Sequence, residues 1–204
     1  MKILFHKNDL PADLDLGKSV AIDTETMGLK PSRDRLCLIQ LSSGDGTCHL
    51  VHIDLTGEAY PGNLVTLLSD DSVQKIFHYA RFDVAVLMHT FGIYLNNIYC
   101  TKIASKLVRT YTDRHGLREL CKELLGVEIS KQEQSSYWGS DELSEEQKKY
   151  AATDVLYLHK LKDILDARLE KEGRIELAQE CFNFILTRSY LDLLAGEDFD
   201  VFSH

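Results

Sequence analysis

The sequence predicts an α/β protein in which helices flank a mixed sheet and a helical region follows at the C-terminus. Strand-like segments gather in the first third of the chain. Strand-like and helical segments then alternate, and every segment after Thr101 has a helical pattern. This order is typical of a sheet that combines antiparallel and parallel strands.

The first segments predict a three-strand antiparallel meander. Residues 19–25 read SVAIDTE, an apolar run that leads into a turn at Gly28 and Pro31. Residues 35–42 and 47–54 are apolar and partly β-branched, and the Ser-Gly-Asp-Gly sequence between them is typical of a hairpin turn. These three segments therefore form the expected antiparallel part of the sheet.

The middle of the chain predicts the parallel part of the sheet. A short helix is expected over 61–69 and a strand over 73–78. Apolar residues at helical spacing predict a helix over 80–91, which ends at Gly92, and a short strand is expected over 98–100. We expect these later strands to join the meander as parallel strands.

The remaining segments predict helices over 101–109, 116–125, 144–172 and 174–193. Ser144, followed by two glutamates and a glutamine, is a strong signal for a helix N-terminus. We expect one domain over 1–172 and a helical extension over 173–204. Since the extension has apolar residues on more than one helical face, it is expected to pack on the domain or to form a subunit interface.

Composition points to a globular protein rather than a disordered or membrane-spanning one. The chain has 204 residues, 44% hydrophobic and 27% charged, and contains no apolar run near the ~18 residues of a membrane span. The N-terminal residues lack the features of a signal peptide. Five scattered cysteines without a C-x-x-C motif are expected to be reduced thiols in a cytoplasmic protein.

The charge balance argues against one class of partner. Asp and Glu number 32 against 23 Lys and Arg, which gives a formal net charge of −9. Proteins that hold long duplexes usually present a basic surface to the phosphates. Any nucleic-acid partner is therefore expected to be short, bridged by metal, or bound by a local basic patch.

Two carboxylates lie where a buried strand should be apolar. Asp23 and Glu25 follow Val20-Ala21-Ile22 and point to the same face of the predicted strand. Like charges repel and resist desolvation, so a covered strand would need a counter-charge such as a divalent cation. The alternative is a strand that has already reached its exposed end, where acids cost little.

Two further acids complete a pattern. Asp83 lies early in the helix over 80–91, where it could simply complement the helix dipole. Asp154 lies four residues after Tyr150, on the same helical face, and alone could be a solvated acid. Together the four carboxylates offer oxygen ligands for two hard cations, which can promote phosphodiester cleavage, while the Tyr hydroxyl orients the attacking water.

These motifs resemble those of the DEDDy 3′–5′ exonucleases, a branch of the ribonuclease H-like superfamily that includes ribonuclease D. The D-x-E of Asp23 and Glu25, the aromatic-Asp of Phe82-Asp83 and the Y-x-x-x-D of Tyr150 and Asp154 occur in the family's order. The resemblance implies a ribonuclease H-like sheet and two Mg²⁺ or Mn²⁺ ions bound by the four acids. The histidine of the sister h-type group is replaced here by Lys149, which indicates the y-type.

Within that branch the chain is similar to the nanoRNase C family of small bacterial enzymes. Stretches such as RDRLCLIQLSSGDG and KIASKLVRTYTDRHGL carry the similarity. It implies hydrolysis of dinucleotides, including linear di-GMP, to 5′-mononucleotides by a homo-oligomer in the form of an octameric ring. Tyr137, which precedes Trp138, departs from the Asp common in ribonuclease D.

The family motif also implies substrate contacts. Leu29 matches a residue wedged between the last two bases, Thr24, Thr26 and Met27 match the lining of the 3′ nucleotide, and His78 and Phe82 are expected nearby. Leu29 and Phe82 could equally be core residues, and His78 a structural histidine. Basic residues over 102–118 could cap a 5′ phosphate, Arg114 and His115 foremost, or form a solvated helix face or a subunit contact.

Three other functions remain open at this point. One is a ribonuclease D-like exonuclease that trims longer RNA such as tRNA 3′ ends. Another is a non-catalytic nucleic-acid-binding protein on the same fold, and the third is a metal-dependent phosphatase acting on a small molecule.

Overall fold

The structure is a computed structural model that describes residues 1–54, 60–130 and 132–203. Its strands are β1 (Lys2–Lys7), β2 (Ser19–Thr26), β3 (Leu36–Ser42), β4 (Thr47–His52), β5 (Gln74–Phe77) and β6 (Ile98–Cys100). Its helices are α1 (Gly62–Ser69), α2 (Ala80–Phe91), α3 (Thr101–Val108), α4 (Leu117–Leu120), α5 (Glu145–Leu156), α6 (Leu158–Lys171) and α7 (Ile175–Ala195). A π-helical turn, η1 (Cys121–Leu125), extends α4.

The described strands form one mixed sheet in the order β1-β4-β3-β2-β5-β6. Strands β2, β3 and β4 are antiparallel neighbours, while β5 and β6 continue the sheet in parallel, so the predicted meander with parallel strands is confirmed. Strand β1 was missed by the sequence analysis. It pairs in parallel with β4 at the edge of the sheet, where Lys2 lies opposite Thr47 and Lys7 opposite His52.

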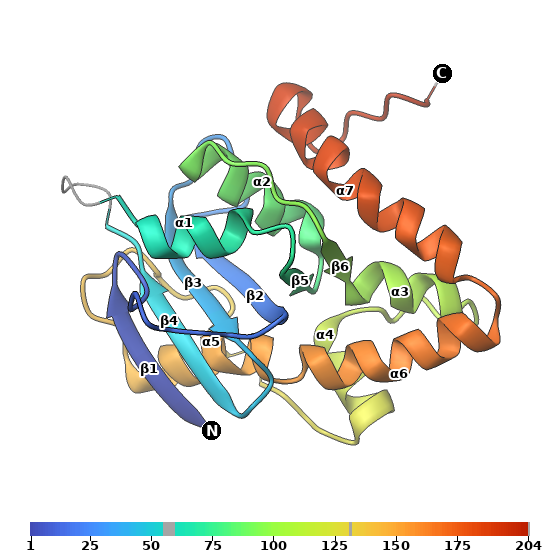
Figure 1. The fold of residues 1–204 in the computed structure, drawn as a ribbon, viewed down its shortest axis with the longest axis horizontal. Coiled ribbons are helices and arrows are strands. Elements are labelled where there is room, and N and C mark those ends of the chain that lie inside the picture. Colours follow the sequence, from blue (N-terminus) through green and yellow to red (C-terminus); the bar gives the residue numbers. More distant parts are fainter. Residues whose placement is uncertain (55–59, 131, 204) are drawn as a thin grey trace.

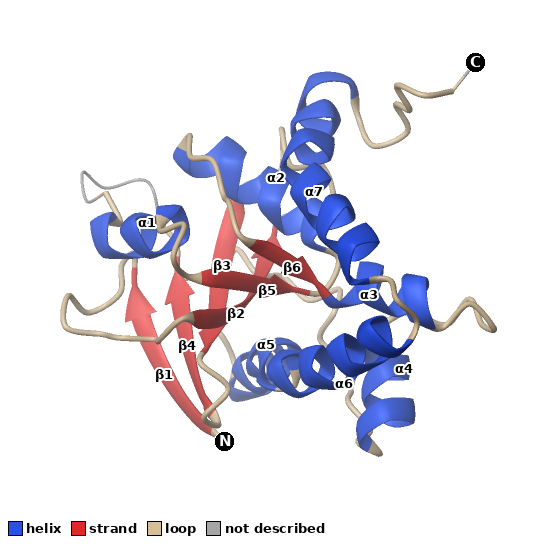
Figure 2. Cartoon of the chain, turned by 45° about the vertical axis from the view of Figure 1, so that its right-hand side comes forward, coloured by secondary structure: helices blue, strands red, loops and turns tan. Residues whose placement is uncertain are grey.

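The sheet separates two layers of helices (Figures 1 and 2). Helix α5 packs under β2, β3 and β4, and α2 covers the other face of the sheet. The apolar run Val20-Ala21-Ile22 of β2 lies between these layers and is fully buried. Of the helices in the described parts of the chain, none combines the length and apolar character that a bilayer crossing requires.

The prediction of one continuous helix over 144–172 is wrong. This segment forms two helices, α5 and α6, which meet at Tyr157, where the backbone torsions are φ −103° and ψ −6°. Helix α5 packs against the sheet, whereas α6 packs against α3 and α7. Tertiary packing therefore sets this break, since the sequence there contains neither Gly nor Pro.

Helix α7 packs along α2 and α3. Its own residues Ala178, Phe182 and Ile185 are buried in these contacts, and the ring of Phe182 lies 4.6 Å from that of Tyr99, centroid to centroid. The division of the chain at residue 172 stays a prediction.

Candidate active site

Three carboxylates converge under the sheet at the end of β2. Asp23 and Glu25 point from β2 toward α5, and Asp154 points back from the third turn of that helix. One carboxylate oxygen of each residue lies within 4.8 Å of the others. The structure therefore brings together acids that are 131 positions apart at their furthest, Asp23 and Asp154.

The electrostatics of this cluster call for a cation. Burial raises the pKa of Asp23 to about 7. Burial and then the charges of Asp23, Asp154 and Asp83 raise the pKa of Glu25 to about 10. In the described parts of the chain no lysine, arginine or histidine forms an ion pair with these acids. An all-oxygen donor set of this kind fits hard divalent cations such as Mg²⁺ or Mn²⁺.

Asp83 approaches the cluster from the other layer. The turn after β5 places Tyr79 in the left-handed region, at φ 72°, and α2 then begins at Ala80. Asp83 is 3% exposed, and its carboxylate accepts a 2.7 Å hydrogen bond from the Thr24 hydroxyl. Burial and the charge of Asp23 raise the pKa of Asp83. It lies outside the three-acid cluster but interacts with it electrostatically.

Tyr150 stands beside the cluster on α5. Burial and the Asp154 charge raise the pKa of its hydroxyl, so the phenol keeps its proton at neutral pH. Burial and the Asp23 charge raise the pKa of Asp154, while a hydrogen bond with Tyr150 opposes that rise. The ring of Trp138 lies 6.1 Å from the Tyr150 ring, which fixes the phenol against the cleft wall.

The start of α5 anchors the segment that carries Trp138. Ser144 and Gln147 form a reciprocal capping box, as their sequence predicts. The Gln147 amide also donates to the Ser136 hydroxyl and the Tyr137 carbonyl, both at 3.1 Å. The same polar side chain thus begins the helix and holds one wall of the cleft.

A cleft of about 640 Å³ opens over these groups. Of the predicted residues its lining includes Asp23, Thr24, Glu25, Thr26, Met27, Leu29, His78, Phe82, Tyr150 and Asp154. Other lining residues had no substrate role predicted from the sequence, among them Tyr79, Ser130, Gln134, Ser135, Ser136 and Trp138. Asp83, Arg114 and His115 are not part of the lining.

A family model described as 3′-5′ exonuclease matches residues 4–170. The chain belongs to the 3′–5′ exonuclease family. Ribonuclease D of Gluconacetobacter diazotrophicus is 35% identical over 158 residues, which cover 77% of this chain and 39% of that protein. Ribonuclease D of Bartonella henselae is 30% identical over 97% of this chain and 48% of that protein. The chain thus spans between about two fifths and a half of these curated relatives.

Solved structures of this type are also similar to the chain, two of them along its whole length. Brucella melitensis NrnC with bound Mg²⁺ is 55% identical, with a TM-score of 0.93 and 100% of both chains covered. Brucella melitensis NrnC bound to pGG is 56% identical, covers 100% of this chain and 99% of that chain, and has a TM-score of 0.94. Escherichia coli RNase D is 27% identical over 90% of this chain and 46% of that chain, with a TM-score of 0.70. The ribonuclease H-like exonuclease fold is thereby confirmed.

Leu29 lies on the rim of the cleft and not in the hydrophobic core of the protein. Its side chain is 81% exposed in the loop after β2, and Met27 is also exposed. Phe82 is half-buried and packs against the core while also facing the cleft. The geometry leaves Leu29 free to contact a ligand.

His78 lies at the base of the cleft. Its Nδ1 is 2.8 Å from the Thr101 hydroxyl. Burial and then the charge of Lys102 lower the pKa of His78 to about 3, so the ring is neutral at pH 7. His78 can therefore offer a hydrogen bond here but no positive charge.

The basic stretch over 102–118 reaches the cleft, but not through Arg114 and His115, the two residues that the sequence favoured. Lys102 and Arg118 line the cleft. His115 is buried, with Nδ1 2.9 Å from the Ser105 hydroxyl, and the Arg114 carbonyl accepts a 2.7 Å hydrogen bond from Arg109. The substrate role given to Arg114 and His115 stays a prediction, while Lys102 and Arg118 are basic residues of the described part of the chain that line this cleft.

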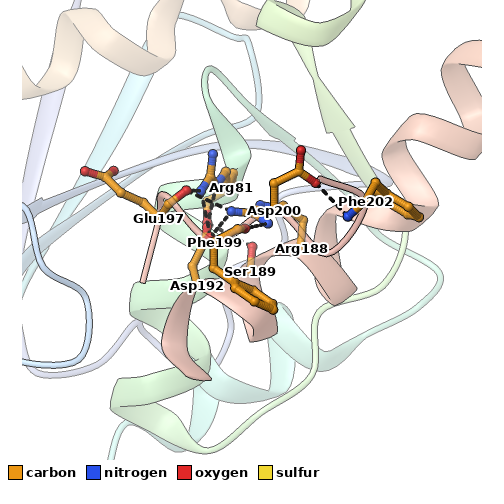
Figure 3. Close-up of polar contacts among 8 residues, drawn as sticks. All are labelled: Arg81, Arg188, Ser189, Asp192, Glu197, Phe199, Asp200 and Phe202. Atoms are coloured by element: carbon orange, nitrogen blue, oxygen red, sulfur yellow. Dashed lines mark hydrogen bonds and ion pairs between the residues drawn. The ribbon is translucent and has the colours of Figure 1, made fainter. Parts of the chain in front are cut away.

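The first turn of α2 is clamped to α7 by a network that the sequence analysis missed (Figure 3). Arg81, next to Phe82 and Asp83, donates to both Asp192 oxygens at 2.5 and 2.7 Å. The Ser189 hydroxyl donates to the Arg81 carbonyl at 2.8 Å. The C-terminal helix therefore supports the turn that presents Asp83.

Proposed function

We propose that this protein is a metal-dependent 3′–5′ exoribonuclease that hydrolyses short oligoribonucleotides to 5′-mononucleotides. Dinucleotides, including linear di-GMP, are its proposed substrates. The observation that carries the proposal is the group of three carboxylates within 4.8 Å on the floor of a 640 Å³ cleft. The pGG-bound NrnC structure supports a short RNA substrate.

The four acids would hold the cations and the other cleft residues would place the substrate. Asp23, Glu25, Asp83 and Asp154 would bind two Mg²⁺ or Mn²⁺ ions, which supply an activated water and a counter-charge for the leaving oxygen. The Tyr150 hydroxyl would orient that water for in-line attack on the phosphorus. The protonated phenol serves as a donor and acceptor there, because burial keeps its pKa raised.

Residues on the rim would set the length of the substrate. Leu29 would wedge between the two bases, and Phe82 would pack against the 3′ base. Lys102 and Arg118 would contact the 5′ phosphate, as charge-assisted donors suited to a phosphate group. A longer RNA would place its next nucleotide where this terminal phosphate sits.

The cellular setting and assembly follow the same proposal. All five cysteines are free thiols and four of them are buried, which supports a reducing compartment such as the cytoplasm.

We infer a homo-oligomer, in the form of an octameric ring. The exposed apolar residues Ile175, Leu177, Tyr190 and Leu194 on α7 support a subunit interface. Light scattering coupled to size exclusion would test it, and a monomer would contradict it.

The experiment that tests the function is a timed digestion of 5′-labelled RNAs of graded length with Mg²⁺. We expect the dinucleotide to be cleaved fastest and a 5′-mononucleotide to be released. Equal rates at every length would refute the dinucleotide preference and favour the second candidate, trimming of longer RNA, which the ribonuclease D relatives support. Rapid release of phosphate from a generic phosphomonoester, with no dinucleotide cleavage, would overturn the nuclease proposal itself.

A further inference from the structure

A buried amide without a partner lies on the strand beside the acidic cluster. Gln40, in the middle of β3, is 0% exposed. Neither its Oε1 nor its Nε2 has a hydrogen-bond partner among the described residues. Buried amides are nearly always satisfied, and leaving one unsatisfied costs stability. Gln40 therefore needs an explanation that the fold itself does not supply.

The sheet register places this amide next to a proposed cation ligand. Asp23 and Gln40 are direct cross-strand partners in the antiparallel pair β2–β3. Side chains of such partners project from the same face, with Cβ atoms about 5 Å apart. That face packs against α5, which carries Asp154. On the far side of Gln40, its partner on β4 is Leu50, which is apolar and cannot bond with the amide.

Asp23 needs a donor that the described residues around it do not otherwise provide. A carboxylate that ligates a cation through one oxygen usually accepts a hydrogen bond at the other, and this partner fixes its orientation. Thr24, its neighbour, points to the opposite face and bonds with Asp83. Gln40 has a free N–H at the right register and on the right face.

We propose that Gln40 is a positioning residue for Asp23, to which its amide donates a hydrogen bond, directly or through one buried water, when the cation is bound. This inference rests on the proposed function, because it assumes that the acidic cluster holds a divalent cation. Gln40 itself touches neither cation nor substrate. Its amide thus lowers the stability of the metal-free protein and tightens cation binding.

Gln40→Met tests this role, since Met has a similar length and no donor. We expect calorimetric titration with Mg²⁺ to show a dissociation constant raised about 10–100-fold. The metal-free variant is expected to melt several degrees above wild type, because the unpartnered amide has gone. Leu41→Met, the neighbouring buried position on the opposite face of β3, is the matched control and should leave Mg²⁺ affinity unchanged.

Each result decides the inference. Mg²⁺ affinity within twofold of wild type in Gln40→Met would overturn it, whatever happens to stability. Gln40→Val is the second variant; if both variants unfold without metal, the amide is a folding requirement and the inference is likewise overturned. Failure of the wild-type protein to bind Mg²⁺ would instead refute the proposed function, which separates the two failures.

Discussion

Removing one acid from the cluster should stabilise the metal-free protein while it destroys the cation site. Burial raises the pKa of Asp23 from 3.8 to about 7, a difference of about three pH units. At about 1.4 kcal/mol per unit, the ionised side chain costs the folded state about 4 kcal/mol above pH 7. Asp23→Asn removes that cost because the amide carries no charge.

The sign of the pH dependence follows from the raised pKa. The folded protein binds the Asp23 proton more tightly than the unfolded chain does. This tighter proton binding contributes to the free energy of unfolding in full below about pH 4, and the contribution is lost as the pH rises through about 7. Wild type and Asp23→Asn should therefore melt at similar temperatures at pH 4 and diverge at pH 8.

Thermal melts in EDTA measure this difference. At pH 8 we expect Asp23→Asn to melt about 10 °C above wild type, given 2–4 °C per kcal/mol for a chain of this size. Excess Mg²⁺ should raise the melting temperature of wild type much more than that of the variant. Glu180→Gln, at an exposed position of α7, is the control and should match wild type. An Asp23→Asn melting temperature at or below wild type in EDTA at pH 8 would show that the ionised Asp23 carboxylate does not destabilise the metal-free protein.

Three further predictions concern groups around the cluster. Tyr150→Phe should lower kcat about 100-fold and leave the Mg²⁺ dependence unchanged; a shifted Mg²⁺ dependence would assign the phenol to cation binding instead. Lys102→Ala should raise KM about tenfold for a 5′-phosphorylated dinucleotide and leave KM for the unphosphorylated one unchanged, and equal effects on both would contradict a phosphate contact. Asp192→Asn should destabilise the fold by about 2 kcal/mol, because this 8%-exposed carboxylate pairs with Arg81 and Arg188. The melting temperature should fall by about 4–8 °C, and an unchanged melting temperature would show that these ion pairs do not stabilise the fold.

Periodicity was sufficient to predict most of the fold because it encodes which side of an element is buried. The meander and the helix over 80–91 have strong local patterns and sharp turn signals. Strand β1 was missed because its stability comes from pairing with β4, more than 40 residues later. The break at Tyr157 was missed for the same kind of reason, since packing on different neighbours bends a chain that has no local helix breaker.

In the candidate site, too, features marked by local sequence could be predicted and features set by contacts between distant segments could not. Asp23 and Glu25 stood out in the sequence because like charges in an apolar strand are costly unless a cation balances them. Asp154, which the structure brings to these two acids, was predicted from its place in the pattern of four carboxylates and Tyr150. In the basic stretch the sequence favoured Arg114 and His115, whereas Lys102 of α3 and Arg118 of α4 line the cleft. The sequence could not show this, because it does not reveal which side of the molecule each basic side chain faces. The Arg81–Asp192 pair joins positions 111 residues apart, and no local signal marks it.

Cation dependence of the acidic site is measured by the initial rate of dinucleotide hydrolysis as a function of Mg²⁺ concentration, for wild type and Asp154→Asn. We predict a rate for wild type that is zero in EDTA and saturates with Mg²⁺. Asp154→Asn should be folded and inactive at every Mg²⁺ concentration. Wild-type hydrolysis in EDTA, or undiminished hydrolysis by Asp154→Asn, would contradict a cation-dependent site built from these carboxylates.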